Sequence, residues 1–535
     1  MNPKLPANLS FQRADHRAEF DRARTTCKSA MKDLARDDAV ATLAALGAAL
    51  DGAVARLKRD LLGSALCWNE DNHALTDWIY QQHRRLADMA HGLLEHDGPL
   101  PPVLAAFVLH HEGEAMKWIA GRERPDVATL NAVAARAFDA GIARHGLRWS
   151  FDGRGCETTL EAMYLRVMLL DRLGTGVLTR QQVEVLDAWL VEWRRDLRLF
   201  DARRDGPALH VDLSTARGLR ADAAPEDASV LWLALGVLER RRREVVAELQ
   251  HGRIVPAYGC AAEFRIEEHV AVLRHLQRAF TSPAEAASRR EARESAPATR
   301  VEAWIGIQEI LAEAQPGSRG VETGQWRSLD FTSEPAAPID PHRRYLWLCD
   351  TSAGGCGFEA LEQDAAGIEV GDLVGWRRGT AIALGRVIRR LPGKSPGQVF
   401  LGVRLLTETA LPFTLKRIDA GEAGQDTHDY LYVGGDDATG RRDAFLVPES
   451  SFSHERAYRA IAGDERYTLR FNRVRERGRG WVLAGFEILA PQPEVRPLTV
   501  TPETADAMEI PEPVFTLDEE AADPWTHEVP LRLLD

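Results

Sequence analysis

One short stretch, Cys349 to Gly357, carries the residue types with the clearest chemical potential, in the order Cys-Asp-Thr-Ser-Ala-Gly-Gly-Cys-Gly. It follows the apolar run Tyr345 to Leu348, and this order predicts a strand that enters a tight turn. The side chains of Asp350 and Ser352 can bond nearby backbone N–H groups, and glycine tolerates unusual backbone angles. Successive N–H groups in such a turn form a concave site for phosphate oxygens. The residues alone leave two readings open, an anion site and an ordinary hairpin turn.

Three other motifs gather reactive or charged side chains. The segment Gly393 to Gly397 fits the Gly-x-Ser-x-Gly pattern of a hydrolase, but Pro396 and a further strand follow Ser395, which predicts a hairpin turn. The segment His110 to Glu114 lacks the His-Glu-x-x-His order that places two metal ligands on one helical face, and we predict a solvated helix end. The arginines at 240 to 243 point all round a helix, which predicts an exposed face paired with carboxylates.

The cysteines predict neither a zinc site nor a disulfide framework. They stand at positions 27, 67, 156, 260, 349 and 356, without a Cys-x-x-Cys pair or a cluster with histidine. We therefore expect reduced thiols and no bound metal.

The stretch at Asp350 lies in a succession of short strand-like segments. Each is rich in β-branched or aromatic residues and is bounded by glycine or proline, which is typical of a small antiparallel barrel. They are Phe358 to Leu361, Val370 to Trp376, Ala381 to Leu391 and Val399 to Leu406.

The segment from about Arg319 to Leu406 resembles a PilZ domain. That family has a six-stranded barrel, an Arg-x-x-x-Arg loop and then Asp/Asn-x-Ser-x-x-Gly. Asp350, Ser352 and Gly355 match the second motif, whereas the arginines upstream do not form a pair at the spacing of the first. The resemblance implies a cyclic di-GMP site in which arginines stack on guanine and grip phosphate, with polar side chains and glycines beside them. The candidate residues are Arg327, Arg343, Arg344, Asp350, Ser352, Gly354 and Gly355.

The composition indicates a globular chain of several domains. Its 535 residues, 45% of them hydrophobic, suffice for about two to four cores. The net charge of −13 disfavours a nucleic-acid binder, which normally presents a basic surface. No apolar signal segment follows the first residues, and Ser229 to Leu238 is too short to span a bilayer. We expect a cytoplasmic protein that neither binds DNA or RNA nor inserts into a membrane.

The predicted fold class is multidomain, α then β. Apolar residues recur at helical spacing from about Asp15 to Ala279, and Thr179 with Gln182 predicts a capping box at one helix start. Val301 to Ala312 is predicted to be a helix that leads into the barrel. The predicted units are an all-helical domain (1–280), a linker (281–300), a PilZ-like barrel (301–415), a second β-rich unit (425–490) and an acidic, Pro-rich, mostly disordered tail (491–535).

These observations predict a non-enzymatic signalling effector of bacterial type. Its barrel is expected to bind cyclic di-GMP, and its helical domain to contact a protein partner. The alternative is a structural or scaffold protein whose degenerate barrel binds protein and no nucleotide. The missing Arg-x-x-x-Arg pair favours that alternative, whereas the match at Asp350 and Ser352 favours the sensor.

Overall fold

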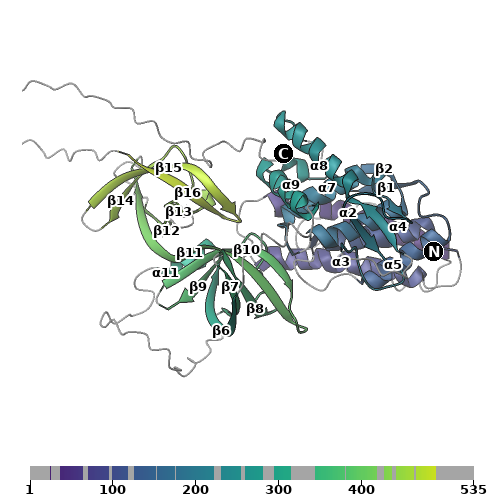
Figure 1. Ribbon diagram of the computed structural model, residues 1–535, viewed down its shortest axis with the longest axis horizontal. Coiled ribbons are helices and arrows are strands. Elements are labelled where there is room, and N and C mark those ends of the chain that lie inside the picture. Colours follow the sequence, from purple (N-terminus) through teal and green to yellow (C-terminus); the bar gives the residue numbers. More distant parts are fainter. Residues whose placement is uncertain are drawn as a thin grey trace, which may run out of the picture.

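The structure is a computed structural model, and it confirms a helical N-terminal half followed by β-structure (Figure 1). The described residues are 25, 36–63, 70–94, 99–118, 126–151, 154–174, 176–221, 230–254, 259–280, 294–314, 344–352, 354–379, 381–418, 427–435, 442–462 and 465–489. Much of the predicted linker and all of the predicted tail lie outside them.

The helical half is a bundle with two small sheets attached. Two short sheets, β1-β2 and β3-β5-β4, were not predicted from the sequence. The helices are α2 (Arg36–Gly63), α3 (Glu70–Leu94), α4 (Pro102–Trp118), α5 (Val127–Asp139), α6 (Leu160–Leu169), α7 (Arg180–Glu192), α8 (Leu235–Gln250) and α9 (Ile266–Phe280). The strands are β1 (Leu147–Phe151), β2 (Arg154–Thr158), β3 (Leu199–Phe200), β4 (Ala208–Val211) and β5 (Leu231–Ala234).

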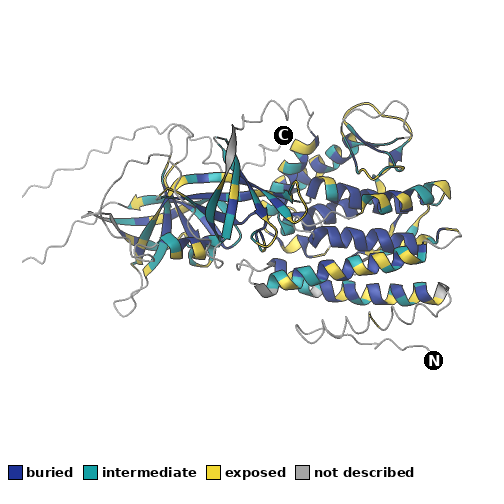
Figure 2. Ribbon diagram, turned by 90° about the horizontal axis from the view of Figure 1, so that it is seen from below, coloured by how far each residue is buried: buried dark blue, intermediate teal, exposed yellow. Residues whose placement is uncertain are grey.

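Helix α4 lies at the centre of this bundle, and nearly all of its side chains are buried (Figure 2). Its apolar residues do not follow one stripe, because neighbours cover it on all sides. The prediction of a solvated helix end at His110 to Glu114 is therefore wrong, since these side chains lie within the core. The predicted capping box at Thr179 and Gln182 is confirmed at the start of α7.

Helix α2 contains the one described segment that is long and apolar enough to cross a membrane, Asp38 to Arg59, by length and composition alone. Its Leu43, Leu46 and Leu50 are buried in the core of the bundle. One face of this segment therefore packs against the bundle.

The C-terminal half is built from long antiparallel strands. One helix, α11 (Gly306–Ala314), accompanies them. The strands are β6 (Glu294–Ile305), β7 (Arg344–Ser352), β8 (Gly355–Leu361), β9 (Leu373–Arg378), β10 (Ala381–Pro392), β11 (Gln398–Arg417), β12 (Thr427–Val433), β13 (Ala444–Pro448), β14 (Ala457–Ala462), β15 (Glu465–Gly478) and β16 (Trp481–Leu489).

Six of these strands close into a barrel in the order β10-β9-β6-β7-β8-β11, because β10 also pairs with β11. Its interior is apolar and includes Leu346, Phe358 and Leu401. Strand β6 corrects two predictions, since residues 294–300 are strand where a linker was expected and 301–305 are strand where a helix was expected. Val301 and Ile305 pack against the barrel interior, and β6 bridges β7 and β9, so this pairing outweighs the helical spacing.

A second ring of strands follows and shares β11 with the first. The C-terminal part of β11 pairs with both β12 and β14. The strands in the order β12-β13-β16-β15-β14 therefore close into a ring with β11. An aromatic core that includes Tyr430, Phe445 and Phe471 fills this ring. The strands predicted in the second β-rich unit are therefore present, but β11 itself passes without interruption from one ring to the other.

Candidate functional site

The hairpin between β7 and β8 places Asp350 on the outer face of the first barrel. Asp350 lies opposite Gly357, whereas the adjacent Phe358 points into the barrel core. A bulge between Leu348 and Asp350 changes the register, so the carboxylate faces outward although Leu348 contacts the interior. Ser352 lies opposite Gly355 on this same outer face.

Two cross-strand rows connect the Asp350 hairpin to arginines of β10 and β11. The first row runs Asp350, Gly357, Gly402 and Arg389. The two glycines add no side chain between the carboxylate at one end and the exposed Arg389 at the other. A row of this kind combines a flat backbone strip with an acceptor and a cation.

The second row runs Ser352, Gly355, Arg404 and Arg386. Both of its arginines form ion pairs with Glu476 of β15, and Arg386 Nη1 lies 3.1 Å from that carboxylate. This row therefore links the outer face of the first barrel to the second ring. No local pattern pointed to these arginines, because they come from strands distant from Asp350 along the chain.

The glycines of the predicted motif have a structural role at this hairpin. A Cβ on Gly355 would lie 2.3 Å from the carbonyl oxygen of Val403, so only glycine allows β11 to approach this closely. Ser352 Oγ donates to the carbonyl of Gly355 at 3.3 Å, and Leu405 N–H donates to the carbonyl of Gly354 at 3.0 Å. These contacts fix the hairpin against β11.

Of the three arginines that the sequence analysis proposed as ligands, Arg344 is the one that the structure describes, and it does not lie at this hairpin. Arg344 begins β7, six residues before Asp350, and a strand of that length separates them by about 20 Å. Arg327 and Arg343 lie outside the described residues. The arginines that the structure brings to the face of Asp350 are instead Arg389 and Arg404.

The buried carboxylate of Glu369 joins the helical bundle to both rings. It comes from the loop before β9 and accepts from Arg180 of α7, with Nη2 to Oε1 at 2.7 Å. Arg479, in the turn between β15 and β16, donates to its other oxygen at 2.6 Å. His73 of α3 lies 3.8 Å away. Burial alone would raise the pKa of Glu369, but the two arginines outweigh it and hold that pKa far below its usual range.

A cavity of about 190 Å³ lies beside this carboxylate, where the bundle meets the two rings. Arginines line it from all three parts, and two of them share one acid: Arg265 of the bundle and Arg477 of β15 each lie 2.6 Å from Glu449. The lining arginines are Arg180, Arg265, Arg386, Arg477 and Arg479. Among the described residues, these charges make the junction a polar, ion-paired contact.

Asp372 is a second buried acid of this junction, and its ionisation is unfavourable. Its Oδ2 accepts the Glu369 N–H at 2.7 Å, and its Oδ1 lies 3.4 Å from Arg479 Nε. Burial raises the pKa of Asp372 to about 6, and the negative charge of Glu369 adds to this despite the attraction of Arg479. Between about pH 4 and pH 6, the folded protein therefore keeps a proton on Asp372 that the unfolded chain has already lost.

We expect Asp372→Asn to be more stable than the parent at pH 7, by about 1 to 3 kcal/mol, because a raised carboxyl pKa is a cost of ionisation in the folded state. The parent should lose stability as the pH rises from about 4 to 6, since the folded state then binds more protons, and the variant should lack this slope. Urea unfolding at several pH values measures both effects. The exposed Asp205→Asn is the control, and a variant that is less stable at pH 7 with an unchanged slope would contradict this assignment.

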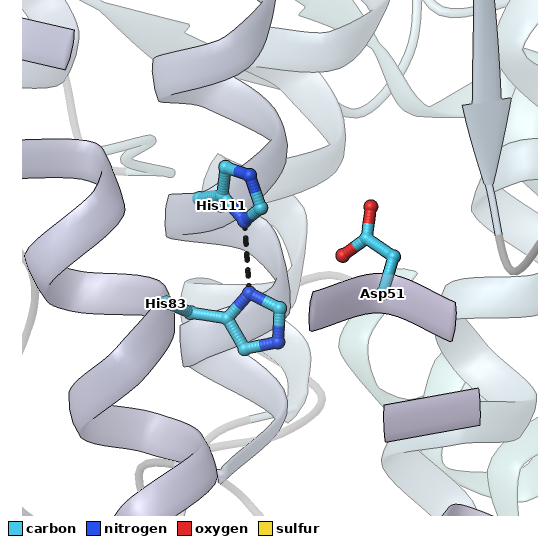
Figure 3. A group of neighbouring side chains, drawn as sticks. All are labelled: Asp51, His83 and His111. Atoms are coloured by element: carbon cyan, nitrogen blue, oxygen red, sulfur yellow. Dashed lines mark hydrogen bonds between the residues drawn. The ribbon is translucent and has the colours of Figure 1, made fainter. Parts of the chain in front are cut away.

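A histidine cluster lies between α2, α3 and α4 (Figure 3). His83 Nδ1 and His111 Nδ1 are 2.9 Å apart, and His110 Nε2 lies 2.9 Å from Asp51 Oδ2. Burial lowers the pKa of His83 to about 3 and that of His111 well below its usual range, so both rings are neutral at neutral pH. The sequence analysis had considered His110 and His111, but His83 and Asp51 carried no local signal.

A network of three cations and three acids lies deeper in the bundle. Arg166 of α6 is its hub and donates to Glu114 at 2.7 Å and to Asp187 at 2.5 and 2.9 Å. Lys117 lies 2.8 Å from each of the same two acids. Lys58 and Glu184 are the other members among the described residues, and all six side chains are buried.

Two other motifs take structural roles. Ser395 belongs to the turn between β10 and β11, where its carbonyl accepts from Gln398 N–H at 3.1 Å, which confirms the hairpin turn. Arg241 and Arg243 of α8 pair with carboxylates as predicted. Arg242 departs from the predicted exposed face, since it is buried and pairs with Glu239.

Comparison with known proteins relates the N-terminal part of the chain to a receptor. Residues 14–204 match a family model described as "Cyclic-di-GMP receptor FimW, N-terminal domain". The matched region includes α2 to α7, and thus the histidine cluster, the buried network and Arg180. No curated protein and no solved structure matches the chain. The relation to cyclic di-GMP receptors therefore comes from the helical half and not from the strands that resemble PilZ.

Proposed function

We propose that this chain is a non-enzymatic receptor for cyclic di-GMP. The observation that carries the proposal is the match of residues 14–204 to the N-terminal domain of a cyclic di-GMP receptor. The motif Asp350-x-Ser352-x-x-Gly355 supports it independently, because it lies on a closed six-stranded barrel, as the PilZ resemblance implies. The protein partner of the helical half and the cytoplasmic location stay predictions.

We propose the outer face of the first barrel as the nucleotide site. Cyclic di-GMP presents two phosphates and two guanines, so its receptor needs cations for the phosphates and acceptors for guanine N–H groups. Arg389 and Arg404 supply planar cations, which bind phosphate through two N–H groups and stack on bases. Asp350 supplies the acceptor, and its carboxylate lies over Gly357, where a Cβ would come within 2.5 Å of Oδ1, so only glycine accommodates it.

The proposal is tested by calorimetric titration of the full chain with cyclic di-GMP. Binding should also raise the melting temperature, because a ligand at about a hundred times its Kd adds about 2.7 kcal/mol to the free energy of unfolding. Cyclic di-AMP should bind more weakly, since adenine lacks the N–H donors that guanine offers to Asp350. Absence of any signal at high micromolar cyclic di-GMP would end the receptor proposal and leave the barrel as a protein-interaction module.

Variants separate the proposed site from its alternatives. Asp350→Ala and Arg389→Ala should each weaken binding about ten- to a hundredfold, because a hydrogen bond to a charged group contributes about 1.5 to 3 kcal/mol. Arg378→Ala is the matched control, since this exposed barrel arginine pairs only with exposed Glu408 among the described residues. If binding is lost instead in Arg327→Ala, Arg343→Ala or Arg344→Ala, the arginines predicted from the sequence hold the ligand.

A further inference from the structure

We propose that His83, His111 and Asp51 form a binding site for a divalent transition-metal ion in the helical bundle. One ligand comes from each of α3, α4 and α2, and their ligand atoms all lie within 4.8 Å of one another (Figure 3). The site is separate from the barrel face and from the junction at Glu369. The test of this metal site therefore does not depend on whether the chain binds the nucleotide.

The separation of the two imidazoles fits a metal ion. Zinc binds histidine nitrogen at about 2.0 to 2.1 Å, and a tetrahedral arrangement then places two nitrogens about 3.3 Å apart. His83 Nδ1 and His111 Nδ1 are 2.9 Å apart, so an ion requires the rings to separate by about 0.4 Å and to turn until both nitrogens face it. It also requires the Asp51 oxygen, within 4.8 Å of the histidine ligand atoms, to move closer. Imidazole with a carboxylate is a ligand set that suits zinc and its neighbours among the transition metals.

The surroundings hold these ligands in place. His110 Nε2 bonds one oxygen of Asp51, which leaves the other oxygen for an ion, and such contacts orient metal ligands in known sites. A Cβ on Gly47 would lie 2.8 Å from His111 Nε2, so this glycine makes space for the ring. The side chain of Asp51 is 26% exposed, which gives an ion a path to two histidines that are otherwise enclosed.

The structural alternative is a simple hydrogen bond between two neutral histidines. In that arrangement one ring donates its Nδ1 proton to the other, and His83 Nε2 is buried and has no partner among the described residues in either tautomer. Such a bond joins α3 to α4. Asp51 of α2 then contacts His110 and neither His83 nor His111. An ion would instead tie all three helices together, and three protein ligands would leave a fourth position for water.

Titration of the metal-stripped full chain with Zn²⁺ and Co²⁺ tests the proposal. We expect one ion per chain, a higher melting temperature with Zn²⁺, and visible Co²⁺ absorption typical of a low-coordinate histidine site. His83→Gln and His111→Gln should abolish the Co²⁺ spectrum and weaken Zn²⁺ binding by more than a hundredfold. His269→Gln is the control, because His269 is also buried but bonds the carbonyl of Ala261.

Asp51→Asn covers the case in which a histidine variant does not fold. The Asp51 side chain is partly exposed, so its replacement should leave the fold intact and weaken Zn²⁺ binding at least tenfold. Fewer than about 0.2 ions per chain, or a Zn²⁺ affinity that is unchanged in Asp51→Asn and in the folded histidine variants, would overturn the proposal. The cluster would then be a hydrogen-bonded histidine pair only.

Discussion

Replacement of Arg166 by methionine is expected to destabilise the protein by about 3 to 5 kcal/mol, because it leaves uncompensated negative charge in the core of the helical bundle. Arg166 contacts both Glu114 and Asp187, and all three side chains are buried. Burial alone would raise the pKa of these two acids, but the surrounding cations lower it in each case. Without Arg166, two cations face three acids.

Urea unfolding of the full chain, followed by helical circular dichroism, measures this effect. The control is Arg253→Met, because Arg253 forms an exposed ion pair with Glu248 that should contribute less than about 1 kcal/mol. The double variant Arg166→Met, Asp187→Asn should regain part of the loss, since it restores equal numbers of cations and acids. A single variant as stable as the control would show that the network does not hold the bundle together.

Replacement of Arg180 by alanine is expected to loosen the bundle from the barrels. Arg180 donates three hydrogen bonds of 2.7 to 3.0 Å to Glu369, which then keeps Arg479 as its main cation. Removing one partner of a buried ion pair commonly costs about 3 to 5 kcal/mol. We expect the parent to unfold in one calorimetric transition and the variant in two, because the helical and β-rich halves of the variant would unfold separately.

The matched control for this junction is Arg59→Ala. Arg59 also carries a cation on the bundle, but its ion pair with Glu263 is more than half exposed. Adding Glu369→Gln to Arg180→Ala should recover stability, since the buried charge is then absent. A single unchanged transition in Arg180→Ala would mean that the other junction contacts, such as the ion pair of Arg265 with Glu449, suffice to join the two halves.

Local sequence signals predicted those parts of the fold that depend on local contacts. The capping box of Thr179 and Gln182 and the turn at Ser395 involve residues within a few positions of one another. The burial of helix α4 was missed because a helix covered on every side lacks the single apolar stripe that reveals its buried face. Strand β6 was misassigned because its partners β7 and β9 come much later in the chain.

The same distinction explains which parts of the candidate site were predictable. Asp350 and Ser352 were found because a hairpin motif is contiguous in sequence. Arg389 and Arg404 reach the same face only through strand pairing, which no local pattern reveals. The pair of Arg180 and Glu369 joins residues 189 positions apart, and His83 meets His111 across two helices.

The single strand β11 has a consequence for how this half of the chain can be divided. Residues up to Ala410 pair with β10 and β8, and from Ala410 onward the strand pairs with β12 and β14. A fragment that starts after Arg417 would lack strand β11 and would expose the edges of β12 and β14 that pair with it. Open edges of this kind recruit other chains, so such a fragment should aggregate when it is expressed alone. Gene fusions and domain shuffling would therefore have to transfer both rings as one piece.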